Sequence, residues 1–126
     1  MKKTKGQLEA EICEAVIKFE KEYMGRGPDE TKAHVIDDMI VVRLQRVLTP
    51  AEKQLAQSDE SRGRALIKQV RIELLEKGRP LLERVVRDIT GRGVKSLHTD
   101  ISTVTGERVI IFTLEGVPAF EAETCK

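Results

Sequence analysis

The chain has 126 residues, of which 40% are hydrophobic and 34% are charged, and 22 Lys and Arg nearly balance 21 Asp and Glu. This length is typical of one domain with a modest core. With an aromatic content of 3% and no Trp, the sequence has no row of rings on which bases or sugars could stack. The net charge of +1 excludes a chain that is strongly basic or acidic as a whole.

The first residues do not form an export signal. The basic start, Met1 to Lys5, is followed by Gln7, Glu9 and Glu11 at the positions where a signal peptide needs an apolar run. Nowhere do about 18 apolar residues run together, as a membrane-spanning helix requires. We therefore expect a cytoplasmic protein.

The first element predicted is a helix that starts after Thr4. Thr4 and Gln7 fit a capping box, in which each side chain accepts a hydrogen bond from an otherwise unpaired backbone N–H. The segment Gly25 to Pro28 ends the helix, because glycine adopts the left-handed cap and proline cannot continue the helix. One apolar stripe at spacings of three and four faces the core: Leu8, Ile12, Ala15, Val16, Phe19 and Tyr23.

A β-hairpin with one solvated face is predicted next. Its strands are Thr31 to Ile36 and Met39 to Val47, joined by a turn at Asp37 and Asp38. A second capping box, Thr49 to Glu52 with Pro50 at the first helical position, starts a short helix that reaches about Gln57.

A long helix and a second hairpin complete the predicted domain. The helix runs from Arg62 to about Thr90, after a further capping residue at Ser58, and it ends at Gly91-Arg92-Gly93. The hairpin strands are Val94 to Ser102 and Arg108 to Leu114. We expect one domain over residues 1–115 and a mobile or loosely docked tail over residues 116–126, which offer few apolar anchors.

The order helix, Gly-Arg-Gly, strand, strand occurs twice. Two αββ units place four antiparallel strands in one sheet with helices on one face, which is an α+β fold with the long helix in the middle of the chain. The repeat indicates either an internal duplication or a coincidence of common caps and hairpins. The two glycine loops follow helix C-termini, so we interpret them as caps rather than as phosphate loops.

The long helix carries two apolar stripes, whereas a surface helix needs one. Because a helix of this length exceeds a compact domain of 126 residues, either it kinks at Gly78-Arg79-Pro80 or its end projects toward a partner. We assign one stripe to the sheet: Leu66, Ile67, Val70, Leu74, Leu81 and Val85. The other stripe packs against the first helix of the same chain or against the same helix of a second subunit, and we favour the second subunit, as a homodimer. Its residues are Ile72, Leu75, Arg79, Leu82 and Val86.

Two histidines, His34 and His98, each precede an aspartate on the first strand of a hairpin. Together with Asp37, Asp38 or Asp100 they are candidates for an acid–base couple or a metal site, although a half-exposed hydrogen-bonding role is the more common one for strand histidines.

No catalytic nucleophile is indicated. The cysteines Cys13 and Cys125 lack the spacing of a metal knuckle or a disulfide framework, and reduced thiols are favoured over a disulfide. No Gly-x-Ser-x-Gly turn is present. We therefore assign no catalytic, cofactor-binding or metal-binding residues.

Charge is unevenly distributed along the chain. Residues 62–95 hold ten basic and four acidic side chains, a net +6, so the remainder is −5. Arg64, Lys68 and Arg71 share one predicted helix face that suits an acidic protein or a phosphate backbone. The lack of interleaved aromatic residues disfavours nucleic acid.

Several motifs resemble those of the MpsC family, small bacterial proteins named after a sodium-translocating, membrane-potential-generating system. They include Gly25 to Pro28, Leu48 to Glu52 with Leu55, His98 to Ser102, and Gly106 to Val109 before Phe112 to Leu114. The resemblance covers about Gly6 to Leu114 and implies association with a membrane system for ion or bicarbonate uptake. It implies no reaction and no catalytic residues.

These observations favour a non-enzymatic accessory or regulatory protein that acts through protein contacts, without inserting into the membrane itself. One alternative is a small-ligand or nucleotide-binding sensor that uses Arg26, His34, Arg92 or His98. A second alternative is a nucleic-acid-binding protein that uses Arg64, Lys68 and Arg71.

Overall fold

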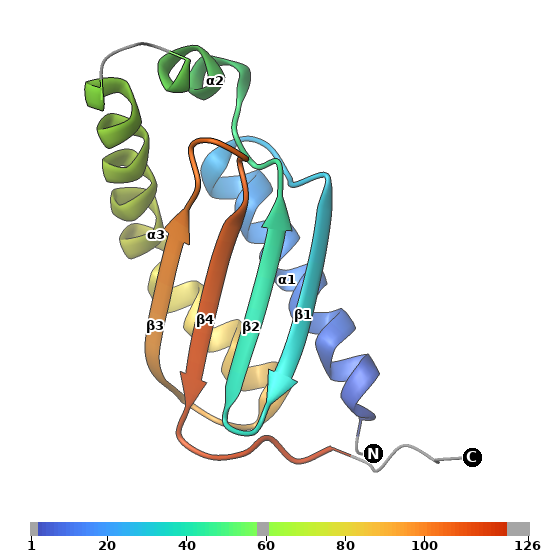
Figure 1. Ribbon diagram of the computed structural model, residues 1–126. Helices are drawn as coiled ribbons and strands as arrows, with labels where there is room; N and C mark the ends of the chain where they lie inside the picture. The colour runs from blue at the N-terminus through green and yellow to red at the C-terminus, as the bar shows by residue number, and fades with distance from the viewer. Residues whose placement is uncertain (1–2, 58–60, 121–126) are drawn as a thin grey trace.

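A computed structural model describes residues 3–57 and 61–120 of the chain. Figure 1 shows a two-layer α+β fold in which α1 and α3 lie behind one face of the sheet, as predicted. The elements are α1 (Lys5–Met24), β1 (Glu30–Ile36), β2 (Met39–Gln45), α2 (Pro50–Ala56), α3 (Ser61–Thr90), β3 (Val94–Ile101) and β4 (Arg108–Leu114).

The four strands form one antiparallel sheet in the order β1-β2-β4-β3. Each hairpin is an antiparallel pair, and β2 pairs with β4 to join the two hairpins. The order of elements repeats as α-β-β on both sides of α2, which matches the predicted repeat. The hairpins place β1 and β3 at the two edges of the sheet.

The helix boundaries arise from the predicted caps. Thr4 and Thr49 both form complete capping boxes, with Gln7 and Glu52 as their partners. Gly25 and Gly91 have φ values of 81° and 74°, the left-handed conformation that glycine adopts at low cost. The glycine loops are therefore helix caps, as predicted. The capping role expected for Ser58 lies outside the described residues.

The core lies between the sheet and the two long helices. Alternate residues of the central strands point into it, and Ile40, Val42, Ile110 and Phe112 are each 0% exposed. From α1 the core receives the predicted stripe, of which Leu8, Ile12, Val16 and Phe19 are buried. The packing is almost wholly aliphatic, as the composition requires.

The two stripes of α3 are exchanged relative to the prediction. Leu75, Leu82 and Val86, for which we favoured a second subunit over the first helix of the same chain, are only 2%, 2% and 0% exposed and belong to the core of a single chain. Of the stripe assigned to the sheet, only Ile67 is fully buried. The remaining residues of that stripe are partly buried or exposed: Leu66, Val70, Leu74, Leu81 and Val85.

The other two residues of the expected interface also differ from the prediction. Arg79 is engaged within its own helix, where it contacts Glu83 at 2.8 Å and Glu76 at 3.3 Å. Ile72 is 49% exposed, the most accessible member of the set. The surface predicted for dimerisation is thus mostly internal, and the homodimer itself stays a prediction.

α3 is continuous over 30 residues, with Pro80 inside it. At about 1.5 Å per residue its length is roughly 45 Å. Its first half lies beside β3, and its second half crosses behind the sheet (Figure 1). The length is accommodated because the helix overhangs one edge of the sheet.

A glycine sets the close approach of α1 and α3. The rings of Phe19 and Tyr23 stack on each other, with centroids 4.7 Å apart, directly over Gly78. A Cβ at position 78 would lie 2.5 Å from Phe19 Cε1 and 3.0 Å from Tyr23 Cε1. Only glycine fits here without movement of the rings.

Replacing Gly78 with Ala is expected to lower the free energy of unfolding by about 1–2 kcal/mol. Alanine gains about 1 kcal/mol of helix propensity, but displacement of the packed rings costs about 2–3 kcal/mol, the upper part of the range for overpacking, because the added Cβ would overlap the Phe19 ring. Urea unfolding measures the difference, with Lys77→Ala on the exposed side of the same helix as the control. A stability equal to or above that of the wild type would contradict the close packing.

Residues 116–120 follow the last strand. Pro118 is buried, and Phe120 is partly buried against the core. The rest of the predicted tail, residues 121–126 with Cys125, lies outside the described residues. Among those described, no helix is both long and apolar enough to cross a membrane.

Candidate functional site

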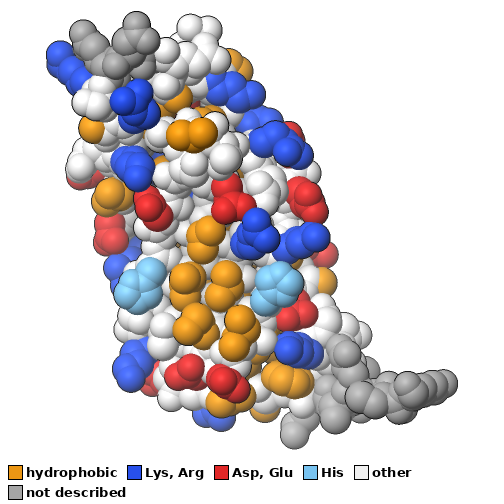
Figure 2. All heavy atoms as spheres, viewed as in Figure 1, with side chains coloured by type: hydrophobic (Ala, Val, Ile, Leu, Met, Phe, Trp, Pro, Cys, Tyr) orange, Lys and Arg blue, Asp and Glu red, His pale blue; other side chains and the backbone are white. Residues whose placement is uncertain are grey.

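The sheet has an open face, which is the side turned away from α1 and α3. Figure 2 shows apolar side chains gathered on this face between two histidines. We define the apolar patch as Ile36, Met39, Val41, Val109 and Ile111, which share the outward-pointing parity of their strands. Ile36 is 53% exposed, and the other four are partly buried.

The strand register sets the side chains of the open face in rows. In the central row, the pairings His34↔Val41, Val41↔Ile111 and Ile111↔His98 run across the whole sheet. The two histidines thus occupy equivalent positions at opposite edges, with two aliphatic residues between them. Both imidazoles are exposed.

This placement does not support a shared site for the histidines. His34 and His98 are three strand spacings apart, or about 14 Å at about 4.8 Å per spacing. One metal ion or one proton-transfer step cannot involve both. The described residues also hold no group of three His, Cys, Asp or Glu side chains that could bind a metal.

The neighbouring row of the open face is charged at its two ends. Lys32 pairs with Arg43, Arg43 with Val109, and Val109 with Asp100. The basic end therefore lies on β1 and the acidic end on β3. Lys32 contacts Glu30 at 3.5 Å, and Asp100 contacts Lys68 at 3.3 Å, and all four side chains are about half exposed or more.

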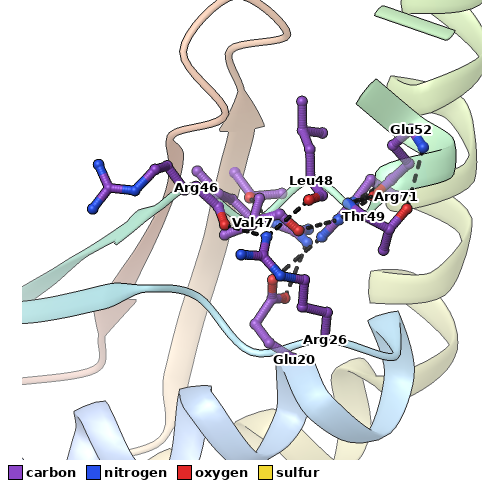
Figure 3. A network of polar contacts seen from close by, with 10 residues as sticks. Glu20, Arg26, Arg46, Val47, Leu48, Thr49, Glu52 and Arg71 are labelled. Carbon is purple, nitrogen blue, oxygen red and sulfur yellow. Dashed lines mark hydrogen bonds and ion pairs between the residues drawn. The ribbon is translucent and has the colours of Figure 1, made fainter. Parts of the chain in front are cut away.

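A second candidate is a buried cluster of charges beneath the other face. Glu20 of α1 is 0% exposed and contacts two arginines, Arg71 of α3 at 3.3 Å and Arg108 of β4 at 3.2 Å. Arg71 also binds Glu52 at 2.6 Å and donates to the Val47 carbonyl oxygen at 2.9 Å. Figure 3 shows Arg71 between Glu20 and Glu52. The cluster ties three helices to the sheet.

Burial shifts the protonation equilibria in this cluster. Desolvation raises the pKa of Glu20, although the two arginines oppose the shift. Desolvation likewise lowers the pKa of Arg108, against the charge of Glu20. Burial alone would raise the pKa of Glu52, but hydrogen bonds from Arg71 and from the Thr49 backbone hold that pKa below its usual value. The charges are thus mutually compensated.

The three most buried charges of the cluster have a signal in the sequence, which is their position in phase with buried apolar residues. Glu20 continues the buried spacing of α1 four residues after Val16, and Arg71 lies midway between the buried residues Ile67 and Leu75. Arg108 has the same strand parity as Ile110 and Phe112. A charged residue in phase with a buried apolar stripe indicates a buried ion pair.

Burial of Arg71 also removes the predicted basic face of α3. The Arg71 side chain is 3% exposed, so it is closed to a phosphate backbone or an acidic partner. Lys68 contacts Asp100 at 3.3 Å, and Arg64 lines a separate pocket. The three residues do not form one accessible surface.

The predicted arginines of the two glycine loops lie far apart and have structural partners. Arg26 follows α1 and donates to the carbonyl oxygens of Arg46 and Leu48 at 2.6 and 2.8 Å (Figure 3). Arg92 follows α3 at the opposite end of the sheet and donates to the Val117 carbonyl oxygen at 3.1 Å. They do not form one ligand site.

A pocket of about 480 Å³ lies between α2, the start of α3 and the β3–β4 turn. Its lining includes the cations Arg46, Lys53 and Arg64, and no described lining residue is acidic. Arg46 is held by Asp29 at 2.8 Å. Of the predicted ligand contacts, only Arg64 lines this pocket.

Of the two cysteines, Cys13 lies within the described residues and is a free, partly buried thiol. Burial raises the pKa of this thiol, and its Sγ lies 3.7 Å from the Thr31 carbonyl oxygen. A raised thiol pKa makes the reactive thiolate scarcer.

Comparison with known proteins identifies the family. Residues 4–116, which span every helix and strand, match the family described as Na+-translocating membrane potential-generating system (MpsC). The chain belongs to the MpsC family. Another sequence similar to it is the uncharacterized protein YbcI of Bacillus subtilis, which is 47% identical over 114 residues and covers 90% of each chain. No solved structure matches the chain.

Membership of the MpsC family confirms the resemblance seen in the caps, hairpins and turns. The similarity to YbcI, an uncharacterized protein, transfers no activity and no site residue to this chain.

Proposed function

We propose that the chain is a non-enzymatic cytoplasmic accessory protein that acts through protein contacts made by the open face. The observation that carries this proposal is the apolar patch, four of whose five residues lie on the two central strands. An antiparallel sheet with one solvated face normally alternates apolar and polar residues, so its outer face is polar. Here the outer positions of β2 and β4 include Met39, Val41, Val109 and Ile111.

The family description supports a particular setting for these contacts. Because the family is named after a sodium-translocating system that generates a membrane potential, we place the chain beside such a system, as a component of bacterial ion or bicarbonate uptake. The buried cluster fits a structural role in this proposal, since its charges satisfy one another. It offers no exposed group for a partner or a substrate.

The pocket lined by Arg46, Lys53 and Arg64 favours a second candidate function, a sensor for a small anionic ligand. Three cations around a pocket of about 480 Å³ suit a phosphate or carboxylate group. In that case the open face would transmit the state of the pocket to a partner.

Complementation in a bacterium that lacks its own copy of this gene tests the proposed function. The double variant Val41→Asp/Ile111→Asp places charges on the open face, and Leu66→Asp/Val70→Asp places the same charges on the exposed stripe of α3. A potential-sensitive dye reports the sodium-dependent membrane potential.

We expect the α3 variant to restore the membrane potential and the open-face variant to leave it at the level of the deletion strain. Circular dichroism and unfolding of both purified variants check that they are folded. Equal restoration by two folded variants would overturn the role of the open face.

A further inference from the structure

We propose that the open face binds a second copy of the chain, face to face, about a two-fold axis that runs parallel to the strands between β2 and β4. This inference rests on the proposed function, because it names the first partner of the same surface. A contiguous apolar patch on a small protein marks an interaction site, and a sheet face is best covered by another sheet.

The rows of the sheet select this axis. Rotation about an axis parallel to the strands lays β1 of one copy over β3 of the other and keeps each row at its own level. The basic end of the charged row, Lys32, then faces the partner's Asp100, and the contact occurs twice by symmetry. Val41 faces the partner's Ile111 at the centre.

An axis perpendicular to the strands would give a poorer match. It reverses the order of the rows, so the charged row would lie over the row that contains Ile36 and Met39. Lys32 would then be buried against the apolar side chain of Ile36, at a desolvation cost with no compensating charge. Arg43 faces an apolar residue of the partner with either axis, Val109 or Met39, so Lys32 and Asp100 decide between them. The charge pattern of the open face therefore specifies the orientation as well as the surface.

The charges that face each other are able to change partners. Lys32 and Asp100 are 64% and 78% exposed, and their present contacts with Glu30 and Lys68 are at 3.5 and 3.3 Å. Exposed ion pairs of this kind contribute about 0–1 kcal/mol, so exchange for a pair across an interface costs little.

The area is sufficient for a reversible dimer. Strands of seven or eight residues span about 24 Å, and four strands spaced by about 4.8 Å give a width of about 19 Å. The flat area of the sheet is thus about 450 Å² in each copy, and the uneven surface of the side chains adds to it. The two copies together bury about 900 Å² or more, which approaches the lower range of specific interfaces. We expect a dissociation constant in the micromolar range.

The exposed stripe of α3 is a weaker candidate for the same role. Leu66, Val70 and Leu81 are 45%, 51% and 44% exposed, but the exposed side chain of Lys77 interrupts the line between Val70 and Leu81. No charge pattern on this stripe selects a partner orientation.

Sedimentation equilibrium over about 1–500 μM, chosen to bracket a micromolar dissociation constant, tests the proposal with the purified full chain. The wild type should pass from one to two chains. Lys32→Asp and Asp100→Lys each place like charges opposite each other twice, and each should weaken association at least about tenfold. The double variant Lys32→Asp/Asp100→Lys restores the pairs and should associate within about threefold of the wild type.

Mixing the two single variants tests the facing of Lys32 and Asp100 most directly. Lys32→Asp and Asp100→Lys should each remain largely monomeric alone, yet form a heterodimer when combined, because both facing pairs are then of opposite charge. The control Lys77→Asp makes the same charge change on α3 and should associate like the wild type. Circular dichroism confirms that every variant is folded.

Three results would overturn the proposal: a wild type that stays monomeric over the whole range, single variants that associate like the wild type, or no heterodimer on mixing. The proposed function is tested separately, by complementation. If the open-face variant fails to complement while the wild type is strictly monomeric, the open face binds a different protein, and only this inference is lost.

Discussion

Replacing Glu20 with Gln is expected to lower the free energy of unfolding by about 3–5 kcal/mol, because it removes one partner of a buried ion cluster. Glu20 is 0% exposed and lies between Arg71 and Arg108, whose side chains are 3% and 2% exposed. Glutamine keeps the shape and the hydrogen-bonding oxygen but leaves the two guanidinium groups with less negative charge. Urea unfolding followed by circular dichroism measures the loss.

The matched control is Glu83→Gln, which makes the same change in a pair with Arg79 that is about one-third exposed. It should cost no more than about 1 kcal/mol, as partly exposed pairs do. A quadruple variant, Glu20→Leu/Glu52→Gln/Arg71→Met/Arg108→Met, should recover most of the loss, since uncharged residues of similar volume replace the whole charged set, including Glu52, the other partner of Arg71. Equal effects of the two Gln substitutions would show that burial does not amplify the charge.

Replacing Phe112 with Ala is expected to lower the free energy of unfolding by a comparable amount, about 3–5 kcal/mol. Phe112 is 0% exposed on β4 and is among the largest fully buried side chains of the core. Its removal leaves a cavity between the sheet and the helices that the aliphatic neighbours fill only in part. Thermal and urea unfolding at low protein concentration measure the effect on a single chain.

The neighbouring residue Ile111 provides the control, because it points to the open face from the same strand. Ile111→Ala should cost about 1 kcal/mol or less at low concentration, where the open face is solvated. At high concentration it should weaken association instead. A stability loss for Ile111→Ala as large as that for Phe112→Ala would show that both faces of β4 are buried within one chain.

Much of the fold could be predicted from local signals. Capping boxes at Thr4 and Thr49 and left-handed glycines at positions 25 and 91 depend on a few neighbouring residues, so sequence alone locates the helix ends. Strand alternation likewise identified the two hairpins. From these elements and their order, the four-stranded sheet with helices on one face followed directly.

The candidate sites were predicted less completely, because they depend on contacts between distant residues. His34 and His98 were singled out, but their common row and their separation across the sheet follow from the pairing of β2 with β4. Arg71 was placed on a solvated face, although Glu20 and Glu52, 51 and 19 residues away in the chain, hold it in the interior.

By itself the sequence determined the elements, their ends and the presence of two apolar stripes on α3. Only the tertiary structure decided which stripe enters the core, with Leu75, Leu82 and Val86 buried while Leu66, Val70 and Leu81 remain exposed. Helical periodicity specifies the angle between two stripes but contains nothing about the direction of the sheet. That direction depends on where α1 and Gly78 allow the helices to approach, which is a property of the packed chain.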